Sequence, residues 1–206
     1  MMSQKIKLKG FTLIELIISM AIMSLMTVVM FADYPESSMR VNLANLTSKI
    51  SLLIREAQIR GSSVDSGVSG NISGYGLYFN LANPNKVIMF NDLAIPSSGG
   101  ISVGNGLYDA VESNLVTNII SGFKINKLCT GGGFPFSTCN ATTLTVSFTR
   151  PNPQAVIYVG ANQTPSSDGG ACIELYSPRA PKVGHVRSVQ VFNSGRISTS
   201  NKGCTS

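Results

Sequence analysis

Residues 9–31, KGFTLIELIISMAIMSLMTVVMF, decide how this chain is built. Residues 11–31 are almost continuously apolar, and as a helix rising 1.5 Å per residue they reach about 30 Å, the thickness of a bilayer core. Lysines precede this run, whereas the first charges after it, Asp33 and Glu36, are acidic. The positive-inside rule therefore predicts a single-pass protein of the cytoplasmic membrane, with its C-terminal part outside.

One carboxylate, Glu15, lies inside the apolar run. An unpaired carboxylate in the membrane costs about 2.5–3.5 kcal/mol even on a lenient insertion scale. Glu15 therefore needs either a partner charge or a route to the headgroups, and the nearby cytoplasmic end of the span offers such a route.

The segment from Lys9 to Glu15, behind a short lysine-rich leader, resembles the class III signal of type IV pilins and type II secretion pseudopilins. In that family a membrane prepilin peptidase cuts after the glycine and methylates the new N-terminus, which here implies cleavage between Gly10 and Phe11. The glutamate equivalent to Glu15 is thought to pair with the N-terminal amine of a neighbouring subunit. Such a pair would offset the cost of burying either charge alone.

This resemblance implies a prepilin-like structural subunit, assembled as a minor pilin into an extracellular type IV pilus or a periplasmic type II secretion pseudopilus. The implied partners are other pilin or pseudopilin subunits, the prepilin peptidase, an inner-membrane assembly platform and an assembly ATPase. Residues 11–31 would hold the chain in the membrane before assembly. Because the family's members are substrates of an enzyme, we expect neither catalysis nor a cofactor.

Two other interpretations of the N-terminus remain open. A cleaved secretory signal would have an apolar region of about 7–15 residues followed by small residues, whereas this run is longer and Met30-Phe31-Ala32 is bulky at the cut. A simple anchored surface domain would keep Gly10 attached to Phe11.

The remainder of the chain has the composition of one globular domain. The whole chain has 206 residues, of which 43% are hydrophobic and 13% charged, which excludes a disordered polyelectrolyte. We expect a leader at 1–10, a transmembrane assembly helix at 11–33, an amphipathic helix at 34–61 and an extracytoplasmic β-rich domain at 62–206.

The amphipathic helix is predicted from apolar residues spaced three and four apart. Pro35 should kink or locally break the helix, because it lacks a backbone donor, and Gly61 should end it. The apolar stripe that should pack on a sheet consists of Met39, Leu43, Leu46, Ile50, Leu53 and Ala57.

Short strand-like segments follow, each bounded by Gly, Pro, Asn or Ser. A hairpin is expected through residues 150–153 and a second one at Asn193-Ser194-Gly195. The fold class is therefore α+β, with a long N-terminal helix packed on a mostly antiparallel sheet, which is also the pilin architecture. The predicted strands are residues 75–79, 86–90, 119–127, 143–149, 155–159, 171–176, 186–192 and 196–199.

Three further segments resemble the H-type minor pilins and pseudopilins, a group that includes the DNA-binding minor pilin T. These segments are residues 55–61 (REAQIRG), residues 74–79 (GYGLYF) and residues 194–197 (SGRI). In the DNA-binding member a second arginine stands two residues after the terminal Gly-Arg pair, but here Ser198 occupies that position.

Four cysteines lie in the C-terminal part of the chain, at spacings that match no compact zinc pattern and favour disulfides in an exported domain. Of the three connectivities that four cysteines allow, we favour Cys129 with Cys139 and Cys172 with Cys204. Phe134 and Phe136, inside the first loop, could contact a partner or fold onto the sheet as a plug. The lone histidine, His185, argues against a multi-histidine metal site, and no metal is expected.

Residues 175–206 contain five basic residues and no acidic one. If the strands bring these side chains to one face, they could bind DNA phosphates, as in the DNA-binding minor pilin of a competence pilus. The alternative is a solvated basic edge that opposes aggregation of the sheet. The five residues are Arg179, Lys182, Arg187, Arg196 and Lys202.

Overall fold

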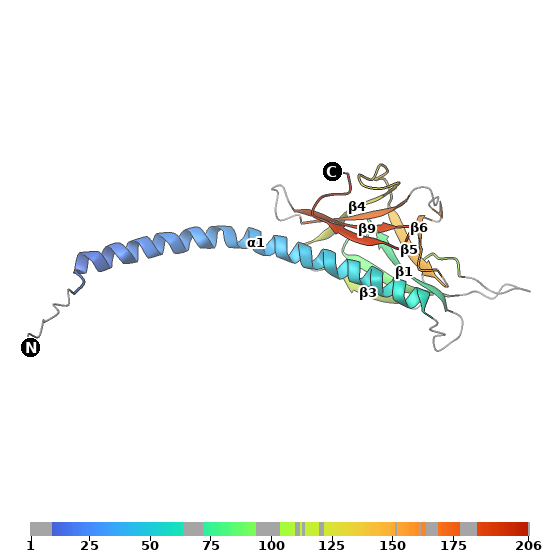
Figure 1. Ribbon diagram of the computed structural model, residues 1–206, viewed down its shortest axis with the longest axis horizontal. Coiled ribbons are helices and arrows are strands. Elements are labelled where there is room, and N and C mark those ends of the chain that lie inside the picture. The colour runs from blue at the N-terminus through green and yellow to red at the C-terminus, as the bar shows by residue number, and fades with distance from the viewer. Residues whose placement is uncertain are drawn as a thin grey trace, which may run out of the picture. The chain divides into compact units, whose positions relative to one another are not determined.

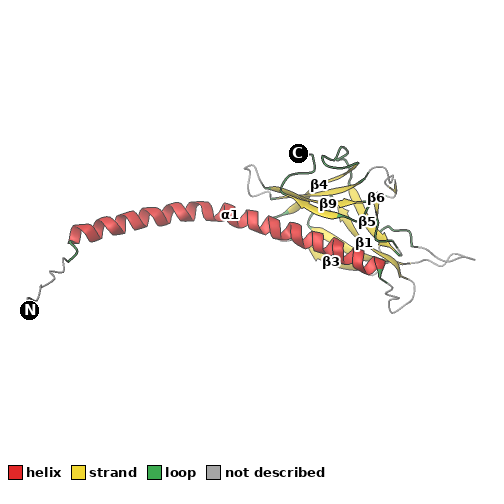
Figure 2. Ribbon diagram, viewed as in Figure 1, coloured by secondary structure: helices red, strands yellow, loops and turns green. Residues whose placement is uncertain are grey.

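The computed structural model describes residues 10–63, 72–93, 104–109, 112, 114–119, 122–150, 152–160, 162–163, 169–177 and 185–205 (Figure 1). The chain divides into two compact units, Met1–Ser38 and Met39–Ser206. One helix, α1 (Leu13–Ser62), contributes residues to both units. The described strands all belong to the second unit (Figure 2).

Helix α1 runs without interruption through Pro35, so the predicted local break is absent. A proline removes a single backbone donor, so it can weaken a long helix without ending it. The helix also continues one residue beyond the predicted end, to Ser62. Gly61 therefore does not end the helix. It lies buried against Phe148, where a Cβ atom would collide with the backbone carbonyl oxygen.

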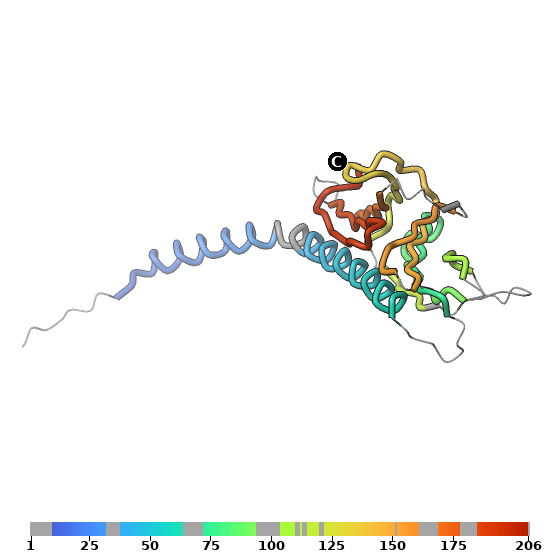
Figure 3. The backbone as a smooth tube through the Cα atoms, turned by 45° about the vertical axis from the view of Figure 1, so that its right-hand side comes forward, coloured from blue at the N-terminus to red at the C-terminus, as the bar shows by residue number. Residues whose placement is uncertain are grey.

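In the second unit, one face of α1 is buried against the sheets, as the periodicity predicts (Figure 3). Met39 and Leu53, both expected in the buried stripe, are only partly buried. Ile54 is fully buried in place of Leu53. Both residues follow Ile50 at a helical spacing, and contact with the sheets decides between them. The buried apolar side chains of the helix are Leu43, Leu46, Ile50, Ile54 and Ala57.

A six-stranded sheet forms the larger layer of the second unit, and its neighbouring strands are all antiparallel. Its strands are β1 (Ile72–Asn80), β2 (Lys86–Leu93), β3 (Asn114–Asn118), β5 (Thr143–Thr149), β6 (Ala155–Val159) and β7 (Asn162–Gln163). They lie in the order β3-β2-β1-β5-β6-β7. The hairpin predicted through residues 150–153 is the β5–β6 pair.

A second antiparallel sheet has four strands. They are β4 (Lys124–Gly131), β8 (Gly170–Tyr176), β9 (Val186–Phe192) and β10 (Ile197–Ser200), in the order β10-β9-β8-β4. The predicted hairpin at residues 193–195 joins β9 to β10, and Gly195 has a φ of +82°, a left-handed conformation that favours glycine.

The strand predicted at residues 119–127 is only partly correct. Its second half belongs to β4, whereas β3 ends before it, at Asn118, and β3 and β4 lie in different sheets. Gly122, with a φ of +98°, lies between them. Ile119 and Ile125 donate backbone hydrogen bonds to Asn85 and Pro84, at the turn between β1 and β2. A segment that resembles one strand can thus contain a change of sheet that periodicity does not reveal.

The core of the second unit lies between α1 and the two sheets. The side chains of Leu144, Val146 and Phe148, predicted on one face of their strand, are all buried there. Thr145 and Ser147, on the opposite face of the same strand, are buried as well. The outer face of the larger sheet is therefore also covered at β5.

Candidate functional site

The N-terminal site begins with an exposed segment ahead of the helix. Gly10 and Phe11 are exposed and lie outside α1. A Cβ atom placed on Gly10 would have no heavy atom within 4 Å, outside its chain neighbours. The fold therefore does not require glycine at this position.

Thr12 and Glu15 form a capping box at the start of α1. The backbone N–H and the hydroxyl of Thr12 donate to Glu15 Oε2 at 3.4 and 3.3 Å, and the Glu15 N–H donates to Thr12 Oγ1 at 3.4 Å. These long hydrogen bonds satisfy backbone donors that the first turn of a helix leaves without partners. The T-x-x-E signature at Thr12–Glu15 is the sequence signal that predicts this cap.

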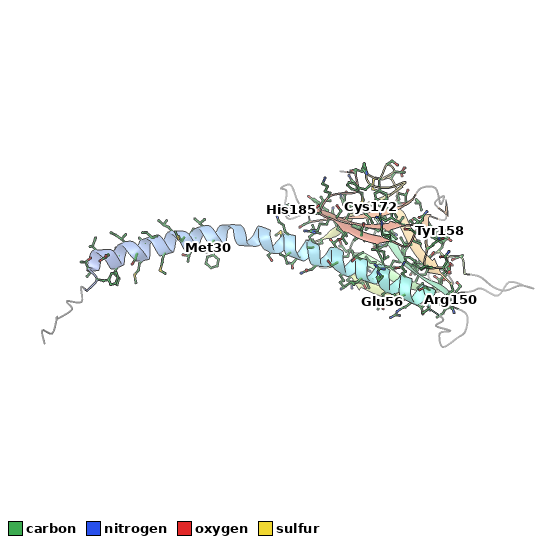
Figure 4. All side chains as sticks on the ribbon, in the orientation of Figure 1. Met30, Glu56, Arg150, Tyr158, Cys172 and His185 are labelled. Atoms are coloured by element: carbon green, nitrogen blue, oxygen red, sulfur yellow. A yellow bond between two sulfur atoms is a disulfide. The ribbon has the colours of Figure 1, made fainter. Side chains whose placement is uncertain are left out.

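The first unit exposes a long apolar helical surface. Leu13–Phe31 has a mean hydropathy of 2.3 and none of it is buried, and by length and composition it could cross a membrane. Large side chains project from this part of α1 all along it, Met30 among them (Figure 4). An apolar surface of this size requires lipid or partner helices.

The three segments that carry the second resemblance meet at the end of α1. Gln58 Nε2 donates to the carbonyl oxygens of Pro153 and Gly195, at 3.0 and 2.9 Å, and so ties the helix to both hairpins. Gly61 and Gly74 both pack against the Phe148 carbonyl. Where the three segments meet, Gln58, Gly61 and Gly74 therefore serve close packing of the helix against the strands.

Replacing Gln58 with alanine should lower the free energy of unfolding by about 1–3 kcal/mol, because two carbonyl groups lose their donor. Urea unfolding of the full chain in detergent would measure this loss. Ser48→Ala, at an exposed position of the same helix, should change stability by less than about 0.5 kcal/mol. Equal midpoints for the two variants would contradict the bridging role of Gln58.

Two disulfides, Cys129–Cys139 and Cys172–Cys204, link segments on the outer side of the smaller sheet, the side that faces away from the main core. Phe136 is buried in a small cluster with these cysteines, and its N–H donates to the Cys204 carbonyl. Phe134 is 43% exposed. Of the two phenylalanines, Phe136 is thus the plug and Phe134 remains open to solvent.

The predicted basic residues do not all share one face. Arg187 pairs with Leu175 and lies on the side of the smaller sheet that faces the core. Arg196 lies on the outer side, where its guanidinium carbon is 4.0 Å from the centre of the Phe192 ring. Lys202 is exposed, and its carbonyl accepts a hydrogen bond from Ser188, also on the outer side. Arg179 and Lys182 lie outside the described residues.

Two lysines that the sequence analysis did not consider lie on this outer side. Lys124 pairs with Tyr176, with its ammonium 5.9 Å from the ring centre. Lys127 is exposed and pairs with Glu174. Glu174 is buried and accepts hydrogen bonds from the Asn126 amide and the Cys204 N–H. We refer to Lys124, Lys127, Arg196 and Lys202 as the basic face.

Buried carboxyl groups fasten residues 104–109 to the outer face of the larger sheet. Asp92 accepts hydrogen bonds from the Ser73 hydroxyl (2.9 Å) and the Gly106 N–H (3.1 Å). Burial is the largest influence on the pKa of Asp92 and raises it above its usual value. Glu112, which accepts from the Leu93 and Asp109 N–H groups, has its pKa raised mainly by burial as well.

These pKa shifts predict a pH dependence of stability. Because the folded-state pKa of Asp92 lies above the ordinary value of 3.8, ionised Asp92 disfavours the fold at neutral pH. This cost should fade as the pH falls through the folded-state pKa towards 3.8. Asp92→Asn should remove this contribution. The free energy of unfolding of the wild type should therefore gain on that of the variant as the pH falls from neutral towards 3.8. A difference that stays constant with pH in urea unfolding would contradict this account.

Within the described part of the chain, no three His, Cys, Asp or Glu residues are placed to hold a metal ion. His185 is buried at the start of β9, and its carbonyl accepts a hydrogen bond from the Ser177 N–H (Figure 4).

Comparison with protein families identifies the N-terminal site. Residues 7–31 match the family model of the prokaryotic N-terminal methylation motif. This match includes Gly10, Phe11, the capping box and the apolar span, and it supports the type IV pilin and pseudopilin family. The α+β architecture, an N-terminal apolar helix followed by antiparallel sheets, is pilin-like. Comparison with curated proteins and with solved structures gave no match.

Proposed function

We propose that this chain is a prepilin-like subunit that is cut between Gly10 and Phe11, methylated at the new N-terminus and assembled as a minor pilin. The fibre would be a type IV pilus or a type II secretion pseudopilus. The observation that carries the proposal is the methylation motif at residues 7–31. This motif includes the start of an apolar helix, and none of the segment Leu13–Phe31 is buried within the chain.

The accessibility of the cleavage position supports processing. A peptidase must hold the backbone on both sides of the bond it cuts, and Gly10 and Phe11 are exposed and lie ahead of the helix. The helix begins two residues beyond Phe11, fixed by the Thr12–Glu15 capping box. The substrate bond is thus presented immediately before a rigid helix.

Cleavage would create a cationic amine at Phe11, near the carboxylate of Glu15. We propose that Glu15 pairs with the amine of a neighbouring subunit as the helix leaves the bilayer, because each charge alone is costly in an apolar bundle. The partners would be other pilins, the prepilin peptidase, an inner-membrane platform and an assembly ATPase. The C-terminal unit would lie outside the membrane, in a pilus or a periplasmic pseudopilus.

The role of the subunit as a minor pilin can be tested by measuring its abundance in filaments. Quantitative mass spectrometry of sheared filaments should find this chain at a small fraction of the most abundant processed pilin. A dominant share would instead make it the main structural subunit. A processed form confined to the membrane would favour a pseudopilin.

DNA binding is a second candidate function, favoured by the basic face. Its four residues come from β4, the β9–β10 turn and the C-terminal tail but share the outer side of the smaller sheet. Tyr176 on the same side offers a ring for stacking. A gel shift with the full chain in detergent should weaken steeply with salt if phosphate contacts dominate, and its absence at low salt would exclude this candidate.

A further inference from the structure

The outward side of α1 in the second unit carries a line of exposed residues, three of them large and apolar. Val41, Leu52 and Ile59 are 57%, 67% and 60% exposed. They are 11 and 7 positions apart, close to three and two full turns of a helix with about 3.6 residues per turn, and therefore lie on one line. We call this line the outer seam; with the exposed residues between them it comprises Val41, Asn45, Ser48, Leu52, Arg55 and Ile59.

The outer seam is separate from the helical face that builds the core. This part of α1 lies along the sheets (Figure 1). Its opposite side is buried there by Leu43, Leu46, Ile50, Ile54 and Ala57. The seam residues are spaced alternately four and three apart, the spacing of a narrow helix-packing seam. A helix that lies in a lipid surface needs a wide apolar face, and here the wide face is already used by the core. The seam therefore fits a protein partner.

The charges on and beside the outer seam indicate what kind of protein it fits. Residues 39–61 contain four basic side chains and one acidic one, Glu56, which pairs with Arg60. Arg55 lies on the seam itself and is exposed, and its guanidinium also donates to Gln58 Oε1 at 3.3 Å. A second copy of this helix would bring its own Lys49 and Arg55 close to these same cations, which opposes association. A partner with carboxylates beside an apolar strip would satisfy them.

We infer that the outer seam is the docking surface for a different subunit of the same fibre, one that presents an apolar strip bordered by Asp or Glu. The inference rests on the proposed function and adds the chemistry of the partner. Leu52 and Ile59 supply the apolar contact, and Arg55 selects an acidic partner over a second copy of this chain.

The test uses the full chain in cells that assemble filaments, with a photo-crosslinking amino acid in place of Leu52. We expect an adduct with another pilin-like subunit, attached within a peptide that contains apolar residues and Asp or Glu. The same probe at Asn42, exposed on the helix but off the seam, should give little of this adduct. Adding Arg55→Glu should remove most of it, whereas Lys86→Glu, the same charge change at an exposed position on β2, should not.

An adduct with a second copy of the chain, an adduct with lipid, the absence of any adduct, or an adduct insensitive to Arg55→Glu would each overturn the inference. Processing and filament content in the same cells report on the proposed function separately. A processed chain that is present in filaments and crosslinks to its own copy would overturn the docking inference and leave the proposed function standing.

Discussion

Gly10→Val should abolish processing of this chain in cells with an active prepilin peptidase, while leaving its fold unchanged. No heavy atom beyond its chain neighbours lies within 4 Å of a Cβ atom placed on Gly10, so valine costs the folded protein nothing through contacts. Any requirement for glycine therefore belongs to the enzyme that cuts the chain. Intact mass of the membrane-extracted protein should show the leader retained in every molecule of the variant.

The fold of the variant provides the control for this prediction. Urea unfolding of the uncut variant should match that of uncut wild-type protein from cells without the peptidase. A variant that is cut as efficiently as wild type would contradict the proposed cleavage between Gly10 and Phe11. A variant that unfolds more readily would show that Gly10 has a structural role.

Glu15→Ala should leave processing largely intact but strongly reduce incorporation into filaments. Removal of Glu15 would leave the amine of a neighbouring subunit uncompensated in an apolar bundle, and breaking a buried pair in this way costs about 3–5 kcal/mol, more than a hundredfold in an equilibrium. Loss of the helix cap costs only about 0.5–2 kcal/mol. The ratio of the chain in filaments to the processed chain in membranes measures the effect.

Glu15→Gln separates the two roles of this side chain. Its amide oxygen can still accept the hydrogen bonds from Thr12, but it carries no charge. We expect Glu15→Gln to be nearly as deficient as Glu15→Ala, and Ser19→Ala, which removes only a hydroxyl bonded to the Leu16 carbonyl, to assemble normally. Normal filament content of Glu15→Gln would assign the role of Glu15 to helix capping instead of charge pairing.

Local patterns predicted the helix and most strands because their signals lie within a few residues of one another. The spacing of Leu43, Leu46 and Ile50 placed the buried face of α1 correctly, and the alternation at residues 143–149 gave β5 its bounds. The choice between Leu53 and Ile54 depended on the sheets that pack on the helix. The same holds for Gly61, which is fixed by its contact with Phe148 and not by helix-ending chemistry.

The pairing of distant strands could not be predicted from the sequence, and it determined the rest of the candidate site. Lys124 meets Tyr176 only because β4 pairs with β8, and the alternation within β9 sends Arg187 to the opposite side from Ser188. Asp92 is buried and holds the segment 104–109 in place because Gly106, fourteen residues later in the chain, donates a hydrogen bond to it. Thr12 is different, since its capping signature was readable locally but was overlooked beside the charge of Glu15.

The central claim is that this chain is processed into a pilin-like subunit, and the intact mass of the protein from filament-forming cells tests it most directly. The account predicts a chain that begins at Phe11 and carries one added methyl group at its N-terminus. A mass that includes residues 1–10 in cells with an active prepilin peptidase, or one that starts at any residue beyond Phe11, would contradict it.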